Sequence, residues 1–506
     1  MKIAYVVSAF VAAVLGFLHY THMLQLNSYK IHEQIKWYKN NAPYIVLRSG
    51  LVMIGLLVFH INAVCAIVIN LAVVALQLPK KAKKPLVYTT RIKRLIVSFA
   101  VLNAVAFLVC MLLGVYYLFS PVSAAFSFAM VLLCRIINTP VENAVQRYYI
   151  NDAKRIINSM PGLTVIGVTG SYGKTSTKFY LEKILSQKYN VVVTPESYNT
   201  TMGVVRTIRE KIKPTHQIFI CEMGARGVGQ IKEICDIVKP KHGIITSVGA
   251  AHLESFKTIE NTTKTKFELC DALSDKGTAV LNGDNEYIRN RKIQKNAVYY
   301  GLENNGVNSF YAGDICVDSN GTAFTCIDEK GEKKQMRTRL AGKHNIINIL
   351  GCIAMARVLG LDYTDIMLGV RSINAVPHRL EIKGSESFLI LDDAFNSNPA
   401  GSTAALEVLQ SMEGYKILIT PGMVELGALQ EESNKNFGIL ASKVCDCVLL
   451  VGRNVAKDIE QGLLEQNYKN YKYFDSFNAA YDYAKTLDSQ QQNKVVLIEN
   501  DLPDNY

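Results

Sequence analysis

The chain has 506 residues and a formal net charge of +12, a length that suits about three domains. Its basic residues crowd between two apolar stretches, at Lys80, Lys81, Lys83, Lys84, Arg91, Lys93 and Arg94. Such a cluster is typical of a segment that flanks a membrane, and because Tyr88 is the one aromatic residue in it, we expect no nucleic-acid partner. The 11 cysteines are scattered without a C-x-x-C pair, which favours reduced thiols over a disulfide framework or a zinc site.

The N-terminal part is apolar enough to cross a bilayer. We expect about four spans, at Ile3–Leu26, Leu51–Leu78, Leu95–Phe119 and Val122–Ile137. The fourth is short for a span.

The positive-inside rule places the basic segment Pro79–Arg94 in the cytoplasm, and four spans then put the N-terminus there too. The same arrangement puts Asn27–Asn41, with its three lysines, outside, against the rule. That segment is either a solvated loop or an interfacial helix. We therefore expect a multi-pass protein of a bacterial-type plasma membrane, with its later domains in the cytoplasm.

From about Asp152 the pattern changes to short apolar runs that alternate with amphipathic helices, which predicts an α/β fold. The expected strands are Val165–Val168, Asn190–Thr194, Ile218–Glu222, His242–Ser247 and Thr278–Leu281, then Leu380–Ile382, Phe388–Leu391, Tyr415–Thr420, Val448–Val451 and Val495–Ile498. Residues 296–340 are expected to form a small antiparallel extension of the first sheet. The expected domains are transmembrane helices (residues 1–150), a P-loop central α/β domain (151–373) and a Rossmann-like C-terminal α/β domain (374–506).

A phosphate-binding loop is predicted where the first strand ends. The chain there reads Gly170, Ser171, Tyr172, Gly173, Lys174, Thr175 and Ser176, followed by a helical pattern. Backbone N–H groups and a helix N-terminus can hold phosphate in this arrangement, with Lys174 at the β- and γ-phosphates and Thr175 on Mg²⁺. An ordinary turn at a helix start is the alternative. Val168 stands where a longer P-loop has its first glycine, so this loop has the compact T-G-x-x-G-K-T form.

Two further strand ends carry candidate metal ligands. Glu222 ends one expected strand, and His252 follows a glycine turn after another. Ligands bind at the carboxyl ends of strands in open α/β sheets, and a carboxylate is a hard ligand for Mg²⁺. Taken singly, Glu222 is also compatible with a solvated acid at a strand end, and His252 with a histidine satisfied in the core.

The order of these motifs resembles that of Mur ligases, especially the type that adds D-Ala-D-Ala to UDP-MurNAc-tripeptide. The matching segments are the compact loop, Asn199–Val204, Glu222–Gly224, Ser247–Glu254 and Lys266–Glu268. The resemblance implies that Glu222 and His252 hold a second Mg²⁺. It also implies that Lys266 matches a lysine that is carbamylated in several members, although Lys266 could instead be a surface lysine.

The resemblance continues through the C-terminal half. Gly342–Asn348 is similar to the motif whose asparagine, here Asn345, is implied to touch adenine, and Val376–Glu381 to one whose arginine, here Arg379, reaches the nucleotide. Asp392–Pro399 and Gly422–Gly427 are similar to two more motifs. They imply a role near ATP for Asp392 and Asp393. The substrate residues implied by all of these motifs are Asn199, Thr200, Asn396, Asn398 and Glu425.

What the resemblance implies is an ATP- and Mg²⁺-dependent amide ligase of peptidoglycan precursor synthesis, with Lys174, His252 and Lys266 as catalytic residues. The expected partners are a small-molecule or lipid-linked cell-wall precursor, an amino acid or dipeptide, and the membrane. Two departures leave the substrate open: the apolar spans stand where a uridine-nucleotide-binding domain is usual, and the end of the chain lacks the K-G-S-R motif. A ligase for a lipid-linked or other polymer precursor and an ATP-driven transporter remain alternatives, and the oligomeric state stays open.

Overall fold

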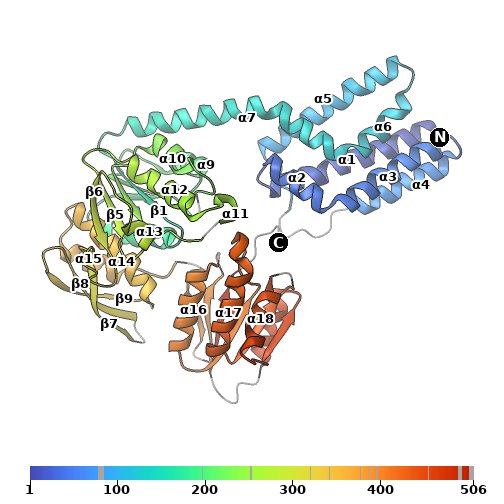
Figure 1. Cartoon of the computed structure of the whole chain (residues 1–506). Coiled ribbons are helices and arrows are strands. Elements are labelled where there is room, and N and C mark those ends of the chain that lie inside the picture. The colour runs from blue at the N-terminus through green and yellow to red at the C-terminus, as the bar shows by residue number, and fades with distance from the viewer. Residues whose placement is uncertain are drawn as a thin grey trace. The chain divides into compact units, whose positions relative to one another are not determined.

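The computed structural model describes residues 1–77, 85–196, 198–250, 253–318, 321–340, 342–376, 378–385, 387–394, 397–424, 426–453, 455–487 and 493–500. The chain forms two compact units, Met1–Tyr148 and Tyr149–Leu502 (Figure 1).

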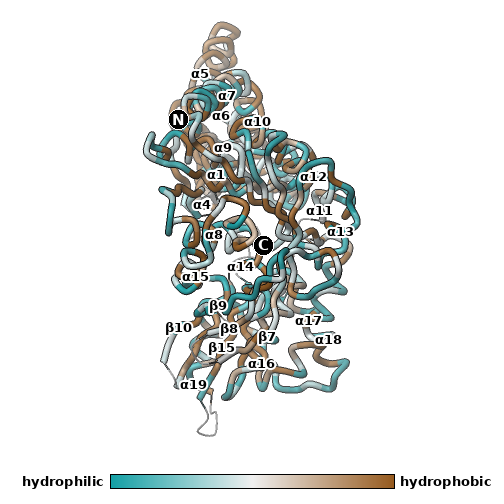
Figure 2. Tube along the Cα trace, turned by 90° about the vertical axis from the view of Figure 1, so that its left-hand side faces the viewer, coloured by the Kyte–Doolittle hydropathy of each residue, from teal (hydrophilic) through white to brown (hydrophobic). Residues whose placement is uncertain are grey.

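The first unit is built from helices, most of which are apolar. They are α1 (Lys2–Leu26), α2 (Ile31–Asn40), α3 (Ala42–Phe59), α4 (Ala63–Gln77), α5 (Thr90–Leu112), α6 (Tyr116–Ala125) and α7 (Ser127–Asn158). Four of them, α1, α3, α5 and α7, are long and apolar enough to be candidates for membrane spans. Figure 2 shows this composition as brown colour along α1 and α5. Helix α4 is also apolar but has 15 residues, fewer than the about 20 that a span needs.

The expected span Leu51–Leu78 is two helices instead of one. Helix α3 ends at Phe59, and Asn62 then caps α4, since its side-chain oxygen accepts hydrogen bonds from the backbone N–H groups of Val64 (2.9 Å) and Cys65 (3.2 Å). The chain turns back here, because Tyr44 at the start of α3 donates a hydrogen bond to the carbonyl of Leu76 at the end of α4. The expected span Val122–Ile137 is likewise divided, between α6 and α7.

The hairpin of α3 and α4 changes which end of the helical unit is expected to carry the N-terminus and which the basic segments. At one end of the unit Gln25 exchanges two hydrogen bonds with the backbone of Val87, and the carbonyl of Tyr29 accepts one from Arg135. At the other end the rings of Tyr5 and Phe59 stack 4.2 Å apart. The basic segment 27–41 therefore lies at the same end as residues 85–91, and the N-terminus lies at the opposite end. For the described part of Pro79–Arg94, the structure differs from the expected arrangement, in which the N-terminus and this segment lie at the same end of the spans.

The second unit contains a six-stranded parallel sheet in the order β2-β3-β1-β4-β5-β6. Its strands are β1 (Thr164–Thr169), β2 (Val191–Val193), β3 (Ile218–Glu222), β4 (His242–Ile245), β5 (Thr278–Asn282) and β6 (Asn296–Tyr300). Successive residues of β3 enter different cores, Ile218 and Ile220 on one face and Phe219 and Cys221 on the other, as expected for a sheet that is covered on both sides.

Helices cover both faces of this sheet. Those that connect or follow its strands are α8 (Lys174–Leu185), α9 (Thr201–Lys211), α10 (Gln230–Val238), α11 (Leu253–Phe256), α12 (Ile259–Asp271), α13 (Glu286–Arg289), α14 (Lys343–Val358) and α15 (Tyr363–Arg371). Residues 296–340 differ from the expectation. Strand β6 pairs in parallel with β5, and β7 (Tyr311–Asp318), β8 (Gly321–Ile327) and β9 (Lys333–Thr338) form an antiparallel sheet of their own.

A second six-stranded sheet follows, in the order β10-β11-β15-β12-β13-β14. Its strands are β10 (Glu381–Ser385), β11 (Phe388–Asp393), β12 (Tyr415–Thr420), β13 (Cys447–Val451), β14 (Tyr471–Phe474) and β15 (Lys494–Glu499), and its helices are α16 (Pro399–Ser411), α17 (Gln430–Val444), α18 (Ala456–Glu465) and α19 (Phe477–Thr486), with a 3₁₀ turn η1 (Gly427–Leu429). All pairs are parallel except β10 with β11. The last strand, β15, therefore lies in the middle of the sheet.

Candidate active site

The predicted phosphate loop lies between the end of β1 and the start of α8. Gly170 (φ +154°) and Gly173 (φ +79°) adopt backbone conformations that favour glycine. A Cβ on Gly170 would lie 2.0 Å from the Thr246 hydroxyl oxygen, and one on Gly173 would lie 2.6 Å from Asn348 Oδ1. The loop is thus held between the segment after β4 and helix α14, with the N-terminus of α8 open to a phosphate.

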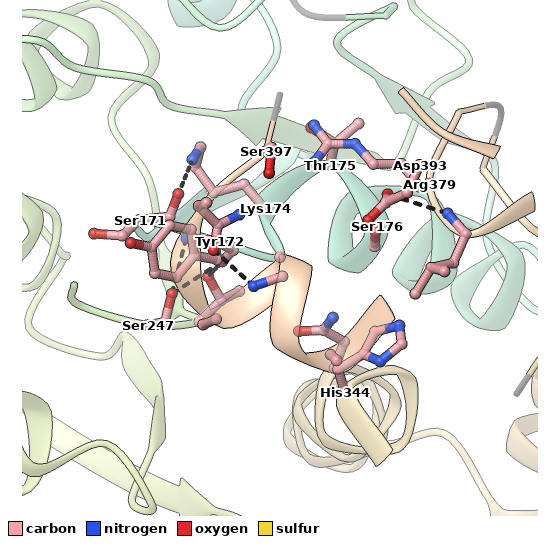
Figure 3. A pocket seen from close by; sticks show the side chains of 18 of the residues that line it. Ser171, Tyr172, Lys174, Thr175, Ser176, Ser247, His344, Arg379, Asp393 and Ser397 are labelled. Carbon is pink, nitrogen blue, oxygen red and sulfur yellow. Dashed lines mark hydrogen bonds between the residues drawn. The ribbon is translucent and has the colours of Figure 1, made fainter. Parts of the chain in front are cut away.

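Lys174 is the first residue of α8, and its side chain returns over the loop. Its Nζ donates hydrogen bonds to the carbonyls of Gly170 (2.8 Å) and Ser171 (3.1 Å). Burial lowers the pKa of Lys174 to about 8; Glu222 opposes this shift and Arg379 adds to it. The ammonium therefore lies inside the loop that would surround the phosphates, together with the backbone N–H groups of that loop (Figure 3).

The segment after β4 supports the loop from the other side. The backbone N–H of Tyr172 donates to Ser247 Oγ at 2.8 Å, and Ser171 Oγ and the N–H of Gly249 are joined at 3.0 Å. Ser171 of the loop and Ser247 lie near each other in Figure 3. These bonds fix the loop before any ligand binds, which reduces the entropy cost of binding.

Glu222, at the end of β3, meets Thr175 directly. Its Oε1 accepts hydrogen bonds from Thr175 Oγ1 (3.1 Å) and Asn199 Nδ2 (3.0 Å), and its Oε2 lies 3.0 Å from Lys178 Nζ. The side chain is 1% exposed. Burial alone would raise the pKa of Glu222, but Lys178 and Lys174 outweigh it and lower the pKa.

These residues fit a magnesium ion. A carboxylate and a hydroxyl, both hard oxygen ligands, converge next to the phosphate loop. In this structure Lys178 Nζ occupies the side of Glu222 Oε2 at 3.0 Å, so a divalent cation would share this carboxylate with an ammonium. The described part of the chain contains no cluster of three acidic, histidine or cysteine side chains that could hold a metal by themselves. His252, the other predicted magnesium ligand, lies outside the described residues.

Lys266, on α12, is almost completely buried, with 3% of its surface exposed. Burial, together with the charge of Lys174, holds the pKa of Lys266 well below its usual value. Its Nζ lies 5.7 Å from the centre of the Phe256 ring. A neutral amine is the form that can react with carbon dioxide, so this environment is compatible with the carbamate that the resemblance implies.

A cavity of about 310 Å³ joins the phosphate loop to residues of the C-terminal half. The predicted site residues in its lining are Ser171, Tyr172, Gly173, Lys174, Thr175, Ser176, Asn345, Arg379, Asp393 and Asn398. Asn345 Oδ1 accepts a hydrogen bond from the Tyr180 hydroxyl at 2.7 Å. His344 lies beside it, and burial lowers its pKa to about 4, so its imidazole is neutral. The lining thus combines two cationic side chains, Lys174 and Arg379, with the amide of Asn345, groups that suit the phosphates and the base of a nucleotide.

Other predicted residues make contacts away from the cavity. Asp392 pairs with Lys383 and with His378, each at 2.8 Å, on the β10 side of its strand. Thr200 caps α9 by accepting a hydrogen bond from the N–H of Gly203, and Asn199 reaches Glu222. Asn398, besides lining the cavity, caps α16. Asn396 and Glu425 lie outside the described residues.

Sequence reasoning missed two charged residues of the site. Glu499 ends β15 in register with Asp393 on β11, is fully buried, and lines the same cavity. Ser397 Oγ donates to Glu499 Oε1. Burial raises the pKa of Asp393 to about 6, against the effect of Arg379, and burial with the nearby Asp393 raises that of Glu499 well above its usual value. Lys178 is the second missed residue. The sequence signal that could have found it is its spacing of one helical turn from Lys174.

Comparison with known proteins gives consistent matches over this unit. The family described as Mur ligase middle domain matches residues 168–356, and the one described as Mur ligase, glutamate ligase domain, matches residues 378–499. The UDP-N-acetylmuramoyl-tripeptide--D-alanyl-D-alanine ligase of Escherichia coli (strain K12) is 34% identical over 293 residues, 57% of this chain and 64% of that protein. The Bacillus subtilis (strain 168) enzyme of the same name is 31% identical over 56% of this chain and 61% of its own. The chain thus spans less than two thirds of the length of these relatives.

Solved structures are similar over a larger share. MurF from Acinetobacter baumannii has a TM-score of 0.64 and 25% identity, and covers 70% of this chain and 77% of its own. MurF ligase from Thermotoga maritima, solved in complex with ADP, has a TM-score of 0.62 and 26% identity, and covers 70% of this chain and 80% of its own.

Proposed function

Since this chain carries the middle and C-terminal domains of the Mur ligase family, we propose that it is an ATP-dependent ligase that joins a carboxylate to an amine. The observation that carries the proposal is the convergence of three chemistries on one cavity. The lining provides Lys174 and the loop N–H groups for phosphate, and Arg379 with Asp393 from the C-terminal half. Thr175, also in the lining, donates a hydrogen bond to Glu222 behind it, and these two residues would form the magnesium site.

The reaction that suits this site has two steps. A carboxylate oxygen of the first substrate attacks the γ-phosphorus of ATP, and the bond to the β-phosphate oxygen breaks to give an acyl phosphate and ADP. The amine then attacks the acyl carbon, a C–N bond forms, and inorganic phosphate leaves as the nitrogen loses a proton. Lys174 and Arg379 would stabilise the charge that moves onto the phosphate oxygens, and Glu222 and Thr175 would hold the Mg²⁺ that neutralises it.

We propose that the substrates are those for which the relatives are named, a UDP-N-acetylmuramoyl-tripeptide and D-alanyl-D-alanine. The apolar first unit favours a second candidate, in which the carboxylate belongs to a lipid-linked precursor at the membrane. The active-site chemistry is the same in both cases, so the two differ in which carrier the first unit would bring to the cavity.

We also propose that the first unit anchors the protein in the plasma membrane, with the ligase unit in the cytoplasm. The end of the bundle that carries residues 27–41 and 85–91 holds Lys30, Lys36, Lys39 and Arg91. The positive-inside rule then assigns this end to the cytoplasm and the N-terminus to the outside. This assignment removes the conflict that a single span over Leu51–Leu78 created for residues 27–41.

The test is ADP release by the full chain in detergent, with ATP, Mg²⁺ and each substrate added singly and together. The proposal predicts ADP release that requires both UDP-N-acetylmuramoyl-tripeptide and D-alanyl-D-alanine. Release with the amine and a lipid-linked carboxylate only would favour the second candidate. Release that needs neither carboxylate nor amine would contradict a ligase.

A further inference from the structure

Lys178 is a fully buried lysine that no step of the proposed reaction uses. It lies on α8 one turn after Lys174, so the two side chains share a face of the helix. None of its surface is exposed. A lysine is almost never buried to this extent unless its ammonium group has partners.

The ammonium of Lys178 lies 4.3 Å from the centre of the Phe179 ring and has two oxygen partners, which belong to different segments. Its Nζ lies 3.0 Å from Glu222 Oε2, at the end of β3, and donates a hydrogen bond of 2.6 Å to the backbone carbonyl of Glu196. Glu196 precedes Asn199 and Thr200, the predicted substrate residues, and has a φ of +42°, which is unusual for a residue with a side chain. Lys178 therefore holds a strained peptide of the 194–200 segment in place.

The same segment is tied to Glu222 a second time. Asn199 Nδ2 donates to Glu222 Oε1 at 3.0 Å, and the carbonyl of Asn199 accepts a hydrogen bond from the N–H of Gly224 at 2.7 Å. The Thr194 hydroxyl accepts one from the N–H of Glu222. Glu222 thus contacts the phosphate-loop helix and the 194–200 segment at once, and Lys178 closes the connection between them.

A divalent cation on Glu222 would compete with Lys178 for the same carboxylate. Two cations a few ångströms apart repel strongly in a buried site, where water screens their charges little. Because one ammonium makes both contacts, a displacement of Lys178 Nζ by the cation disturbs its hydrogen bond to the Glu196 carbonyl as well. Cation binding is therefore linked to the conformation of the 194–200 segment, and by thermodynamic reciprocity a ligand on that segment changes the affinity for the cation.

We propose that Lys178 is a positioning residue that couples the magnesium site at Glu222 to the 194–200 segment, so that Mg²⁺-nucleotide binding prepares this segment for the carboxylate substrate. The proposal rests on the proposed function for the identity of the two sites. Beside the direct hydrogen bonds of Glu222 with Asn199 and Thr194, it adds a connection to the segment that starts from the phosphate-loop helix.

The test is hydrogen exchange of the amides of residues 194–203 in the full chain, with AMP-PNP and either Mg²⁺ or EDTA. In the wild-type protein we expect Mg²⁺ to accelerate exchange of this segment at least about threefold, and Lys178→Met to exchange rapidly in both conditions. The matched control is Lys183→Met, which removes an exposed lysine from the same helix and should respond as the wild type does.

Two results would overturn the coupling. One is an unchanged exchange rate in the wild-type protein although a binding isotherm shows that Mg²⁺-AMP-PNP is bound. The other is a Lys178→Met variant that is protected and responds to Mg²⁺ like the wild type. If Lys178→Met does not fold, the double variant Lys178→Met/Glu222→Gln, which removes both charges, tests the fold of the site. The comparison of wild-type protein with and without Mg²⁺ still decides the proposal. If wild-type protein binds no Mg²⁺-AMP-PNP, the proposed function fails instead.

Discussion

At the scale of single residues, the nucleotide site depends on a few charges that are held in place before a ligand arrives. Lys174 is fixed by two backbone carbonyls of its own loop, and Glu222 by an amide, a hydroxyl and an ammonium. Preorganised groups of this kind stabilise a transition state without a free-energy cost of reorganisation during the reaction. Their removal should thus affect the chemistry more than the fold.

The first prediction is that Lys174→Ala reduces kcat/KM for ATP by roughly 10²–10³-fold, the scale of a single electrostatic group. The physical reason is the loss of the cation at the transferred phosphate. Steady-state ADP release measures the effect, and circular dichroism checks the fold. Lys183→Ala on the same helix serves as control and should retain full activity. A Lys174→Ala variant within threefold of the wild type would remove this lysine from the mechanism.

The second prediction concerns the pair Asp393 and Glu499. Because both pKa values are raised, the folded protein keeps protons that the unfolded chain has already lost, so the unit becomes less stable as the pH rises from 4 through about 6. For Asp393 alone, a pKa of about 6 in place of 3.8 corresponds to about 3 kcal/mol.

Glu499→Gln cannot ionise and should therefore melt at a higher temperature than the wild type at pH 8, with a difference that disappears near pH 4. Thermal unfolding at several pH values measures this. Glu413→Gln, an exposed glutamate of the same domain, should leave the curve unchanged. A Glu499→Gln variant that is less stable than the wild type at pH 8 would contradict the raised pKa of Glu499.

The residues that could be predicted are those whose signal is local. Glycine spacing, Lys174 and Thr175 fall within one short stretch and specify one backbone path. Glu499 could not be predicted, because its place beside Asp393 follows from β15 entering the middle of the second sheet, a pairing between residues more than 100 positions apart. Lys178 could not be predicted either, because its partners Glu222 and Glu196 come from other segments of the chain.

At the scale of elements, the turn between α3 and α4 decides how the first unit is arranged. Hydropathy alone reads Leu51–Leu78 as continuous, because a turn of three residues, His60 to Asn62, scarcely lowers the average. The capping bonds of Asn62 mark the turn, but they are visible only in three dimensions. The strands were easier to predict, since short β-branched runs between glycines and polar residues set their limits locally.

The third prediction follows from this hairpin. A cysteine at Ile61 and one at His32 should lie on opposite sides of the membrane, because they belong to opposite ends of the helical unit. In a background with Cys65, Cys110 and Cys316 replaced by serine, a membrane-impermeant maleimide should label Ile61→Cys in intact cells. It should label His32→Cys only after permeabilisation. Labelling of both from the same side would contradict the arrangement.

At the scale of the whole molecule, the two units divide two tasks. The unit Tyr149–Leu502 carries the proposed groups for nucleotide and magnesium, whereas the unit Met1–Tyr148 is rich in apolar helices. The two Mur ligase domains could be predicted because their motifs occur in a fixed order along the chain. The substrate could not, because specificity depends on side chains brought from separate elements, several of which lie outside the described residues.

The central claim is that the site activates a carboxylate as an acyl phosphate. The most direct measurement uses UDP-N-acetylmuramoyl-tripeptide with ¹⁸O in its terminal carboxylate, together with ATP, Mg²⁺, D-alanyl-D-alanine and the full chain. We expect one ¹⁸O atom in each inorganic phosphate released, in an amount equal to that of the amide product measured by mass spectrometry. Phosphate without ¹⁸O, released while ATP is consumed, would contradict it.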